Sequence, residues 1–489
     1  MDELTLLLGG DNVDVGKAIT ELKSKRYIET PKTGEYKKAL DPLQHEVYNK
    51  VRRPDKKVKI DTSDMEFESN DNVINVTGSS TVGYRLEPVA RVALAIQKLI
   101  VKRAVSFVFG NAVTLNADAE TDGTKAVLKA LKRVMYDVKE KSLNRRVART
   151  LFSCTEVAEY WYPIESTSNT YGFPSKYKLR CAIFSPLLGD SLYPYFDATG
   201  DMIAFSREFS VTSVNNATKN FFETYTKDAH YMWETSADGY KLVDGYPLKL
   251  ELGKIPVVFA TQPQVEWADV QNLIDRLEKL LSNFADTNDY HAAPKIFVTG
   301  KITGFSKKGE SGAIIEGDEG SKAEYLSWNN APEAVKLEIN TLLQMIYTLT
   351  QTPDISFDAV KGLGSLSGIA LKLMFMDAHL KVADHQEVLD EYLQRRVNII
   401  KAFIGKFNAK FLTDADELMV EPIITPYMIR DEAAEMKIWY DANGQQPIIS
   451  QKSAFAKAAL TTDPDADFEQ YTKEQNDKNT FNIGEPTVA

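Results

Sequence analysis

The chain has few of the residues that usually carry catalysis, metal binding or cross-linking. Only two cysteines and five histidines occur among 489 residues, and Cys154 and Cys181 are far apart. This excludes a disulfide framework and a zinc site built from cysteine pairs, and it is typical of a reducing compartment. The motifs G-x-x-x-x-G-K-[ST], H-E-x-x-H, C-x-x-C and G-x-S-x-G are also absent, and with them the usual signatures of ATP hydrolysis, metalloprotease and esterase chemistry. We therefore expect no catalytic residue, no metal and no cofactor.

Long hydrophobic runs are missing as well. The most apolar stretch, residues 92–110, is interrupted by Lys98, Lys102 and Arg103, so it is too charged to span a bilayer. Residues 1–14 lack the basic region that begins a signal peptide. We expect a protein that makes no contact with a membrane.

Positive charge is in deficit. The chain has 58 lysines and arginines against 69 acidic residues, a net charge of -11. A protein that grips nucleic acid through its phosphates should be basic on at least one face. Nucleic acid is therefore either not a partner or a partner that must slide past without sticking. The local basic cluster at 51–59 is either a solvated arm or a contact to acidic neighbour subunits or DNA.

What the chain does contain predicts a mixed α+β fold with more than one packed region, since 489 residues exceed an ordinary single core. A helical pattern begins at Glu87 and turns strand-like at 106–110, and a second helix is expected at 122–140. Residues 144–263 are rich in Tyr, Phe, Thr and Val in alternation, with turn signals between the pieces. This pattern predicts a run of short antiparallel strands.

Two long amphipathic helices are expected after residue 263, at 265–286 and 332–350, the second opened by Pro332. They bracket 295–328, a set of short β-prone pieces, which suits a small module at the end of a two-helix stalk. The first helix carries more acidic than basic residues. In a ring of copies its polar face would make an acidic lumen that repels phosphates; in a single bundle it is an ordinary solvated face.

The glycine-rich segment 361–368 precedes a long predicted helix at 369–405. It is either a phosphate cradle at a helix N-terminus or a mobile loop. Because no strand precedes it, we favour the loop. A row of aspartates in the helix is more simply a solvated face than an acid–base set, and two histidines six residues apart do not share the face that a metal pair needs. Those residues are Asp377, Asp384, Asp390, His379 and His385.

Five stretches in this order resemble the portal proteins of tailed bacteriophages, of the SPP1-type family. They are RVALAIQKLIV (91–101), FVFGNAV (107–113), KIPVVF (254–259), SGIALK (367–372) and ISQKS (449–453). Ala112 stands where the family usually has proline. The most specific likeness is the order helix, small β module, helix, Pro/Gly loop and long helix, and the whole resemblance covers roughly residues 85–475.

The resemblance implies a portal fold with an α/β wing, a two-helix stem, a small β-containing clip and a helical C-terminal crown. Its expected segments follow in chain order: N-terminal arm 1–80, wing 81–263, first stem helix 264–293, clip 294–331, second stem helix 332–350, tunnel loop 351–366, long wing helix 367–405, crown 406–461 and acidic flexible tail 462–489.

The resemblance also implies a function. Such proteins form a ring of about twelve subunits at one capsid vertex, through which double-stranded DNA is packaged and ejected, and they hydrolyse nothing themselves. The expected partners are the terminase large subunit, a head–tail adaptor and the major capsid protein, with the protein in the virion and, during assembly, in the host cytoplasm. The expected site residues are, for the tunnel loop, Asp354, Asp358, Lys361, Gly362 and Gly364; for the stem lumen, Asp275, Glu278 and Lys279; and for the clip, Lys301, Lys307, Lys308 and Glu310.

Two other interpretations stay open. The chain could be another structural ring or connector of a virion, which would lack the stem–clip–stem order. It could instead act on carbohydrate, since Trp161, Tyr162 and Trp233 lie in the aromatic β region. Aromatic residues there are more often the core of a sandwich, and an enzyme would also need a pair of carboxylates in a cleft.

Overall fold

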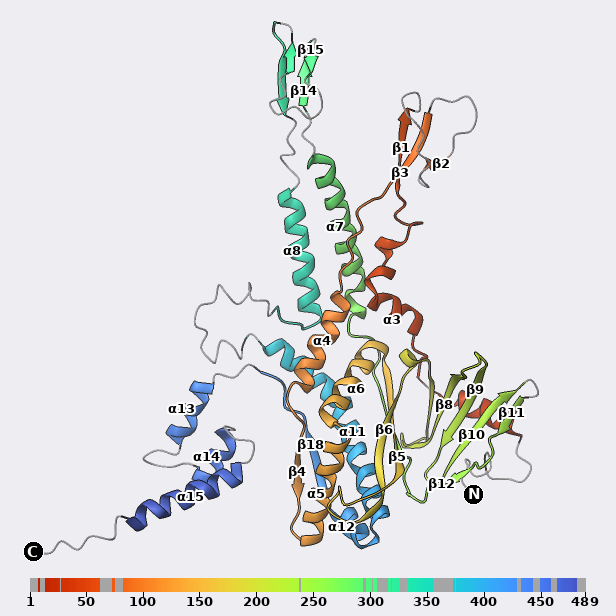
Figure 1. Ribbon diagram of the computed structural model, residues 1–489, viewed down its shortest axis with the longest axis vertical. Coiled ribbons are helices and arrows are strands. Elements are labelled where there is room, and N and C mark those ends of the chain that lie inside the picture. Colours follow the sequence, from red (N-terminus) through yellow and green to blue (C-terminus); the bar gives the residue numbers. More distant parts are fainter. Residues whose placement is uncertain are drawn as a thin grey trace, which may run out of the picture. The chain divides into compact units, whose positions relative to one another are not determined.

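The computed structural model describes residues 8, 14–26, 28–61, 73–74, 82–236, 239–292, 296–300, 302–305, 315–317, 319–325, 332–354, 373, 375–428, 432–442, 449–458 and 464–481. The chain divides into two compact units: residues 1–353 with 378–426, and residues 354–377 with 427–489. Helices and strands both contribute extensively, which confirms the mixed α+β class (Figure 1).

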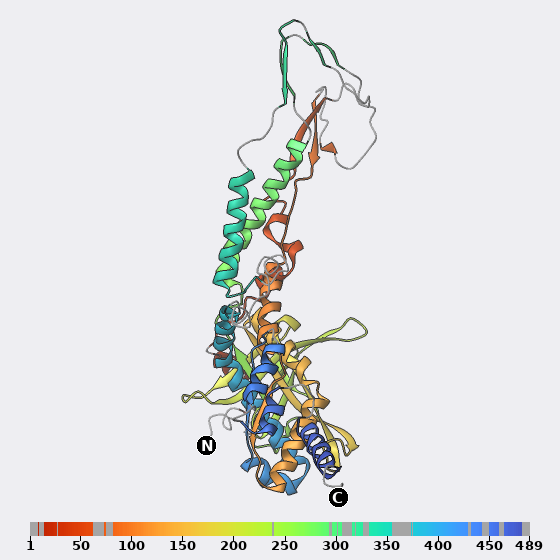
Figure 2. The same cartoon turned by 90° about the vertical axis from the view of Figure 1, so that its left-hand side faces the viewer.

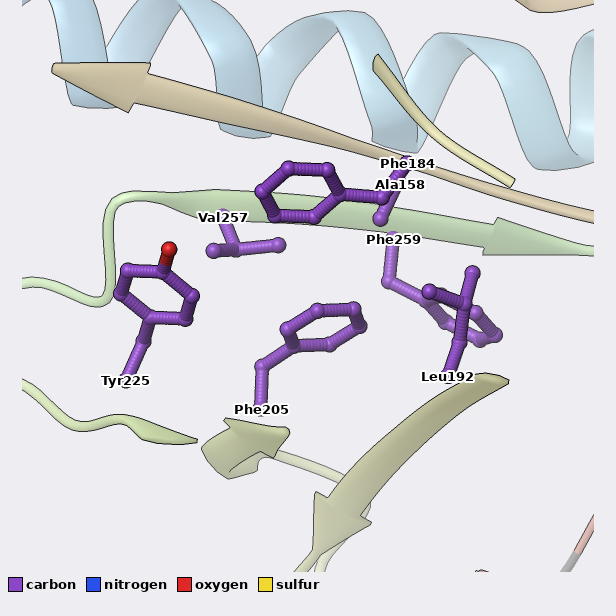
Figure 3. Close-up of a cluster of buried hydrophobic side chains, with 7 residues drawn as sticks. All are labelled: Ala158, Phe184, Leu192, Phe205, Tyr225, Val257 and Phe259. Atoms are coloured by element: carbon purple, nitrogen blue, oxygen red, sulfur yellow. The ribbon is translucent and has the colours of Figure 1, made fainter. Parts of the chain in front are cut away.

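Two antiparallel sheets form the core of the first unit. One has the order β13–β5–β6, and the other has the order β11–β10–β9–β8–β7 with β12 paired to β10. Side chains alternate between the faces of a strand, so Ala158 of β5 and Val257 and Phe259 of β13 all point toward the second sheet, where they meet Phe205 (Figure 3). The strands are β5 Glu156–Ser168, β6 Ser175–Phe184, β7 Ser191–Phe196, β8 Met202–Thr212, β9 Thr218–Tyr225, β10 Ala229–Ser236, β11 Gly239–Leu242, β12 Leu248–Lys249 and β13 Val257–Thr261.

The aromatic residues of this region belong to the core. Trp161 is 1% exposed and Trp233 is 4% exposed. Trp233 lies in a cluster with Phe222 and Tyr195, so neither tryptophan is a platform on which a sugar could stack. The prediction of a run of short antiparallel strands between 144 and 263 is confirmed.

On the opposite face of β5, polar side chains contact helices α6 and α11. Glu159 accepts two hydrogen bonds from the Arg396 guanidinium, at 2.9 and 2.5 Å, and one from the Trp161 indole at 3.1 Å. Arg396 also donates to Asn144 of helix α6, and it is completely buried. Burial alone would lower the pKa of Arg396, but the Glu159 charge outweighs it and raises that pKa. This ion pair fixes the long helix α11 (Met376–Phe407) to the sheet.

Of the two helices expected between residues 87 and 140, the first differs from its expected form. Helix α4 runs Ile96–Phe109 without a strand at its end, so the prediction of a strand at 106–110 is wrong. Phe107, Val108 and Phe109 are all buried, and an apolar run without periodicity does not distinguish a buried helix from a strand. Residues 88–95 are not helical, for a reason given below. The helix expected at 122–140 is confirmed as α5 (Asp122–Asp137), and α6 (Glu140–Cys154) follows it directly.

The N-terminal region is more than a polar arm. Helix α2 (Val15–Ser24) places Ile19 and Leu22 in the cluster that contains Trp233, so it covers the six-stranded sheet. The segments that follow are α3 Thr33–Leu40, the short 3-10 turns η1 Pro42–Gln44 and η2 Glu46–Tyr48, and a three-stranded sheet β1–β3–β2 made by β1 Lys56–Asp61, β2 Val73–Ile74 and β3 Val82–Glu87.

The remaining elements of the first unit include the two long helices, α7 (Gln271–Ala292) and α8 (Pro332–Leu349), close to the ranges expected from their apolar spacing. A strand that the sequence did not predict, β18 (Met419–Ile423), pairs with β4 (Thr114–Asp118). The others are β14 Ile296–Thr299, β15 Ile302–Phe305, β16 Ile315–Gly317, β17 Lys322–Tyr325, η3 Pro186–Leu188, η4 Ala268–Val270, η5 Ala409–Phe411 and α12 Leu412–Glu417.

The second unit contains helices α13 (Glu432–Ala442), α14 (Gln451–Ala458) and α15 (Pro464–Phe481). Phe455 of α14 packs against Phe468 and Tyr471 of α15, with ring centroids 5.7 and 5.2 Å apart. Residues 464–481 therefore form a packed helix in place of the flexible tail that the sequence predicts.

Candidate functional site

Helices α7 and α8 lie side by side (Figures 1 and 2). Ile274 and Leu277 of α7 and Ile346 of α8 are completely buried. The pair is also bridged by Arg276, which donates to Glu338 at 2.7 Å. That ion pair is half-exposed, so water screens it and it contributes little stability. The apolar contact is what holds the two helices together.

Helix α8 also has three large apolar side chains that stay exposed among the residues that the structure describes. Leu337 is 69% exposed, Met345 is 47% exposed and Leu349 is 55% exposed. At about 100° per residue, the three lie within roughly 120° of the helix circumference, directly beside the buried stripe. Single exposed apolar residues are normal on a protein surface, but three large ones on one side of a helix, with Thr341 and Glu338 between them, form a partly apolar face that suits an interaction.

One face of α7 binds the segment that leads into helix α4. Glu278, Ser282 and Asp286 accept hydrogen bonds from the backbone N–H groups of Leu94, Val92 and Ala90, at 2.8, 2.9 and 2.9 Å. Four helical residues advance about 6 Å, and two extended residues advance about 6.6 Å. The two spacings therefore match, and each second residue of 88–94 meets each fourth residue of α7. In a helix that begins near residue 88, the N–H groups of Val92 and Leu94 would bond within the helix, whereas here they bond to side chains of α7.

We call the three α7 residues Glu278, Ser282 and Asp286 the ladder. Two side chains from the N-terminal region also bind to it. His45 lies 2.7 Å from Glu278 and is almost completely buried. Burial lowers the pKa of His45, but its hydrogen bonds to Glu278 and to the Ala39 carbonyl outweigh that effect and raise the pKa above its usual value. Arg53 donates to Asp286 at 2.6 Å.

The contacts of the ladder determine which of the predicted lumen residues of α7 face solvent. Glu278 is 1% exposed and is engaged inside its own chain, so its carboxylate does not face solvent. Asp275 is half-buried, and burial raises its pKa. Lys279 is exposed. The sequence predicts an acidic face on α7. In the structure, Glu278 and Asp286 point instead toward the N-terminal segment, because they bind its N–H groups, His45 and Arg53.

The base of the helix pair is fixed by a buried ion cluster. Glu266 lies 2.6 Å from Lys381 and 3.3 Å from His385, both on α11. Burial raises the pKa of Glu266, but these two partners outweigh it and hold the pKa at about 2. Lys381 also donates to the carbonyl of Thr350 at the end of α8, at 2.9 Å. One lysine thus joins the segment just before α7, the end of α8, and α11.

The expected tunnel loop leaves this base at a defined point. Arg103 of α4 donates to the Pro353 carbonyl at 2.8 Å, and Asp354, the next residue, is exposed. The other four residues predicted to face DNA lie outside the described residues, namely Asp358, Lys361, Gly362 and Gly364.

The expected clip contains two antiparallel pairs, β14 with β17 and β15 with β16. The predicted partner-binding residues lie outside the described residues, namely Lys301, Lys307, Lys308 and Glu310. Their roles stay predictions.

The other candidate chemistry of the sequence is accounted for by ordinary contacts. Asp377, Asp384 and Asp390 are exposed on α11, as a solvated face would be. His385 stacks on Phe152 with ring centroids 4.2 Å apart. Within the described ranges, no three His, Cys, Asp or Glu residues are grouped to hold a metal ion, and no helix is long and apolar enough to cross a bilayer.

Comparisons with known proteins give one family. The model of the family described as "Phage portal protein, SPP1 Gp6-like" matches residues 87–480. No curated protein matches the chain. Among solved structures, a chain from the "Neck of empty GTA particle computed with C6 symmetry" has 10% identity and a TM-score of 0.39, covering 75% of this chain and 89% of that chain. A chain from the "Virion of native gene transfer agent (GTA) particle" has 9% identity and a TM-score of 0.37, covering 75% and 88%.

Proposed function

The chain belongs to the SPP1 Gp6-like family of phage portal proteins, and from this premise we propose that it forms the ring-shaped channel at one capsid vertex through which double-stranded DNA is packaged and ejected. The ring has about twelve copies. The protein is a structural component of the virion and performs no catalysis itself.

The observation that carries this proposal is the uncovered apolar face of α8. Leu337, Met345 and Leu349 are exposed beside a helix pair whose other apolar stripe is already filled. In a ring each subunit offers one face to its neighbour and receives a different one, so a copy of this chain can bury the row on every subunit. A monomer would leave all of them in water.

The assignment of the segments follows from that arrangement. Helices α7 and α8 are the stem, the strands between them are the clip, and residues 351–366 are the loop that meets DNA in the tunnel. We propose that the clip receives the terminase large subunit during packaging and a head–tail adaptor afterwards, and that the wing contacts the major capsid protein. Anchoring by Arg103 and Lys381 supports the loop assignment, because it fixes the carbonyls of Pro353 and Thr350 where the segment begins.

The first test is direct imaging of the purified full-length protein. Negative-stain electron microscopy should show rings with a central hole and a narrow protruding end. A different virion connector would form rings without that end. A monodisperse single-chain particle at micromolar concentration would end the proposal.

The second test concerns the loop. Deletion of residues 356–364 should leave the ring intact, since the contacts at Pro353 and Lys381 remain, and should reduce the amount of DNA packaged or retained. Ring formation is read by electron microscopy and packaging by nuclease-protected DNA. Loss of rings in the deletion would show that the segment is an assembly contact.

A further inference from the structure

A surface hollow of about 780 Å³ lies between strand β4 and the junction of helices α5 and α6. Its lining comprises residues 112–115, then Lys132, Met135 and Tyr136 of α5, and residues 139–142. We call it the β4 groove. Nothing in the ring proposal uses it, and the inference below does not rest on that proposal.

The β4 groove lies at the start of a strand that has an open edge. Within the described residues β4 pairs with β18 alone, so its other edge has no partner strand. Residues 112 and 113 come just before β4, and Thr114 and Leu115 are its first two residues, so the groove borders the beginning of the strand. An unpaired edge offers a row of N–H and C=O groups to an added strand.

The groove has apolar as well as charged lining residues. Met135 is buried and Tyr136 is 78% exposed. The Lys139 ammonium lies 4.9 Å from the centre of the Tyr136 ring, a cation–π contact. The groove thus provides both a backbone edge and a place for one large apolar side chain.

The charge around the groove is opposite to that of the whole chain. Residues 122–150 contain nine lysines and arginines and three acidic residues, in a protein whose net charge is -11. Lys132, Lys139 and Lys141 line the groove, and Glu140 is the acidic residue among its lining. A bound segment should therefore be acidic.

Duplex DNA has the right charge but the wrong shape for this site. Phosphate binding needs exposed cations on a surface, and it gains nothing from an apolar hollow beside an open strand edge. A peptide strand uses all three features: the edge through its backbone, the hollow through one side chain, and the lysines through its acidic residues.

We propose that the β4 groove binds an extended acidic segment of a partner protein, which adds to β4 as a third strand and inserts an aliphatic or aromatic side chain beside Tyr136. The groove is lined by residues 112–115, and β4 continues beyond it to Asp118. A segment of about seven residues would therefore pair along 112–118, with about four of its residues beside the groove. The proposal thus defines the partner by its chemistry: an extended, acidic segment with one large apolar side chain.

The test uses the assembled full-length protein and a synthetic probe. The probe is a fluorescein-labelled peptide, Asp-Val-Glu-Phe-Glu-Val-Asp, with binding followed by fluorescence anisotropy. Two further peptides carry N-methyl groups at alternate positions, one set at odd residues and the other at even residues. Because only alternate N–H groups of a strand point to its neighbour, one of the two methylated peptides should bind like the parent and the other should lose at least tenfold in affinity.

A matched pair of variants tests the charge. Lys132→Glu with Lys141→Glu reverses two groove lysines, and Lys125→Glu with Lys129→Glu makes the same charge change outside the groove lining. The groove variant should weaken the probe about tenfold and the matched variant less than threefold, since each exposed pair is worth only a few-fold. Thermal unfolding by circular dichroism confirms that both fold.

Three results would overturn the proposal. The first is equal weakening by both variants, which would mean long-range attraction only. The second is equal binding of both methylated peptides, which would show that the peptide does not add to β4 as a strand, or displacement of the probe by a twenty-base-pair DNA duplex at the same concentration, which would show that the surface binds nucleic acid. The third is absence of binding by the parent peptide at 1 mM, as expected if a neighbouring copy already fills the groove.

Discussion

Removing the exposed apolar row of α8 should separate ring assembly from folding. The change is the triple substitution Leu337→Ala, Met345→Ala and Leu349→Ala. These side chains are 69%, 47% and 55% exposed, so a neighbour that covers them buries the equivalent of fewer than two whole side chains. Full burial of a Leu or Met side chain is worth about 1.5–3 kcal/mol, which gives roughly 3–5 kcal/mol for each subunit contact.

Most of that contribution is lost on truncation, since alanine retains only one carbon of each side chain. A loss of about 2–4 kcal/mol per contact weakens each contact by roughly 30- to 1,000-fold. A ring must close every contact at once, so at micromolar protein the triple variant should be mostly monomer or short open oligomers. Mass photometry measures this distribution directly, against the wild-type ring.

The fold of the single chain should survive, because substitutions at exposed positions usually change the free energy of unfolding by less than about 0.5 kcal/mol. Circular dichroism melting checks this. Lys336→Ala with Asn340→Ala serves as the matched control: both residues are exposed on α8, on a face away from the row, and the rings should persist. Intact rings in the triple variant, or equal loss in the control, would refute the assignment of this face to the neighbour.

Three further predictions concern buried ion pairs, and each is read by thermal or chemical unfolding. His45→Gln should remove a pH dependence: because the folded pKa of His45 is raised, its stabilising contribution is complete below about pH 6.5 and is lost as pH rises through the higher folded pKa, so only the wild type should lose stability there. Glu266→Gln leaves Lys381 without its carboxylate and should cost roughly 2–3 kcal/mol near pH 7; with a folded pKa of about 2, the wild-type contribution itself disappears as pH falls from about 4.5 to 2. Arg396→Met alone should cost about 3–5 kcal/mol, because it strands a buried carboxylate, whereas adding Glu159→Gln should recover part of that loss. Equal stability of the single and double variants would show that the pair is not coupled.

Local periodicity sufficed for the elements that bury one face against a neighbour. The apolar spacing of 265–286 and 332–350 predicts two helices, and α7 and α8 occupy nearly those ranges. The alternation between 144 and 263 predicts strands, and the buried Trp161 and Trp233 show that its aromatic residues serve the core. In each case the signal was carried by residues within one element.

Periodicity within one element could not predict contacts between segments that are far apart in the sequence. Residues 88–94 have an apolar pattern compatible with a helix, but Glu278, Ser282 and Asp286, nearly two hundred residues later, take up their N–H groups. Strand β18 forms only because β4, three hundred residues earlier, offers it an edge. The free edge that remains on β4 and the lysines around it were likewise invisible, since the basic surplus of 122–150 is hidden in a chain of acidic net charge.

The ladder on α7 also changes the argument about how DNA could slide through a ring of these stems. An acidic wall requires carboxylates that point into the channel, yet Glu278 and Asp286 point toward their own N-terminal segment. The charged residues at exposed positions of α7 are Arg276, Lys279 and Asp289, and Arg276 is paired with Glu338. Within the described residues, Lys279 is the α7 cation without an ion-pair partner, and one such lysine per helix is too sparse to hold a duplex through released counterions, because only a few phosphates are neutralised. In the proposed ring, low adhesion to DNA would follow from sparse and largely neutralised charge on α7 and not from repulsion, so we expect that changing Lys279 to Glu alters packaging less than placing a second lysine at Asn272 or Asn283.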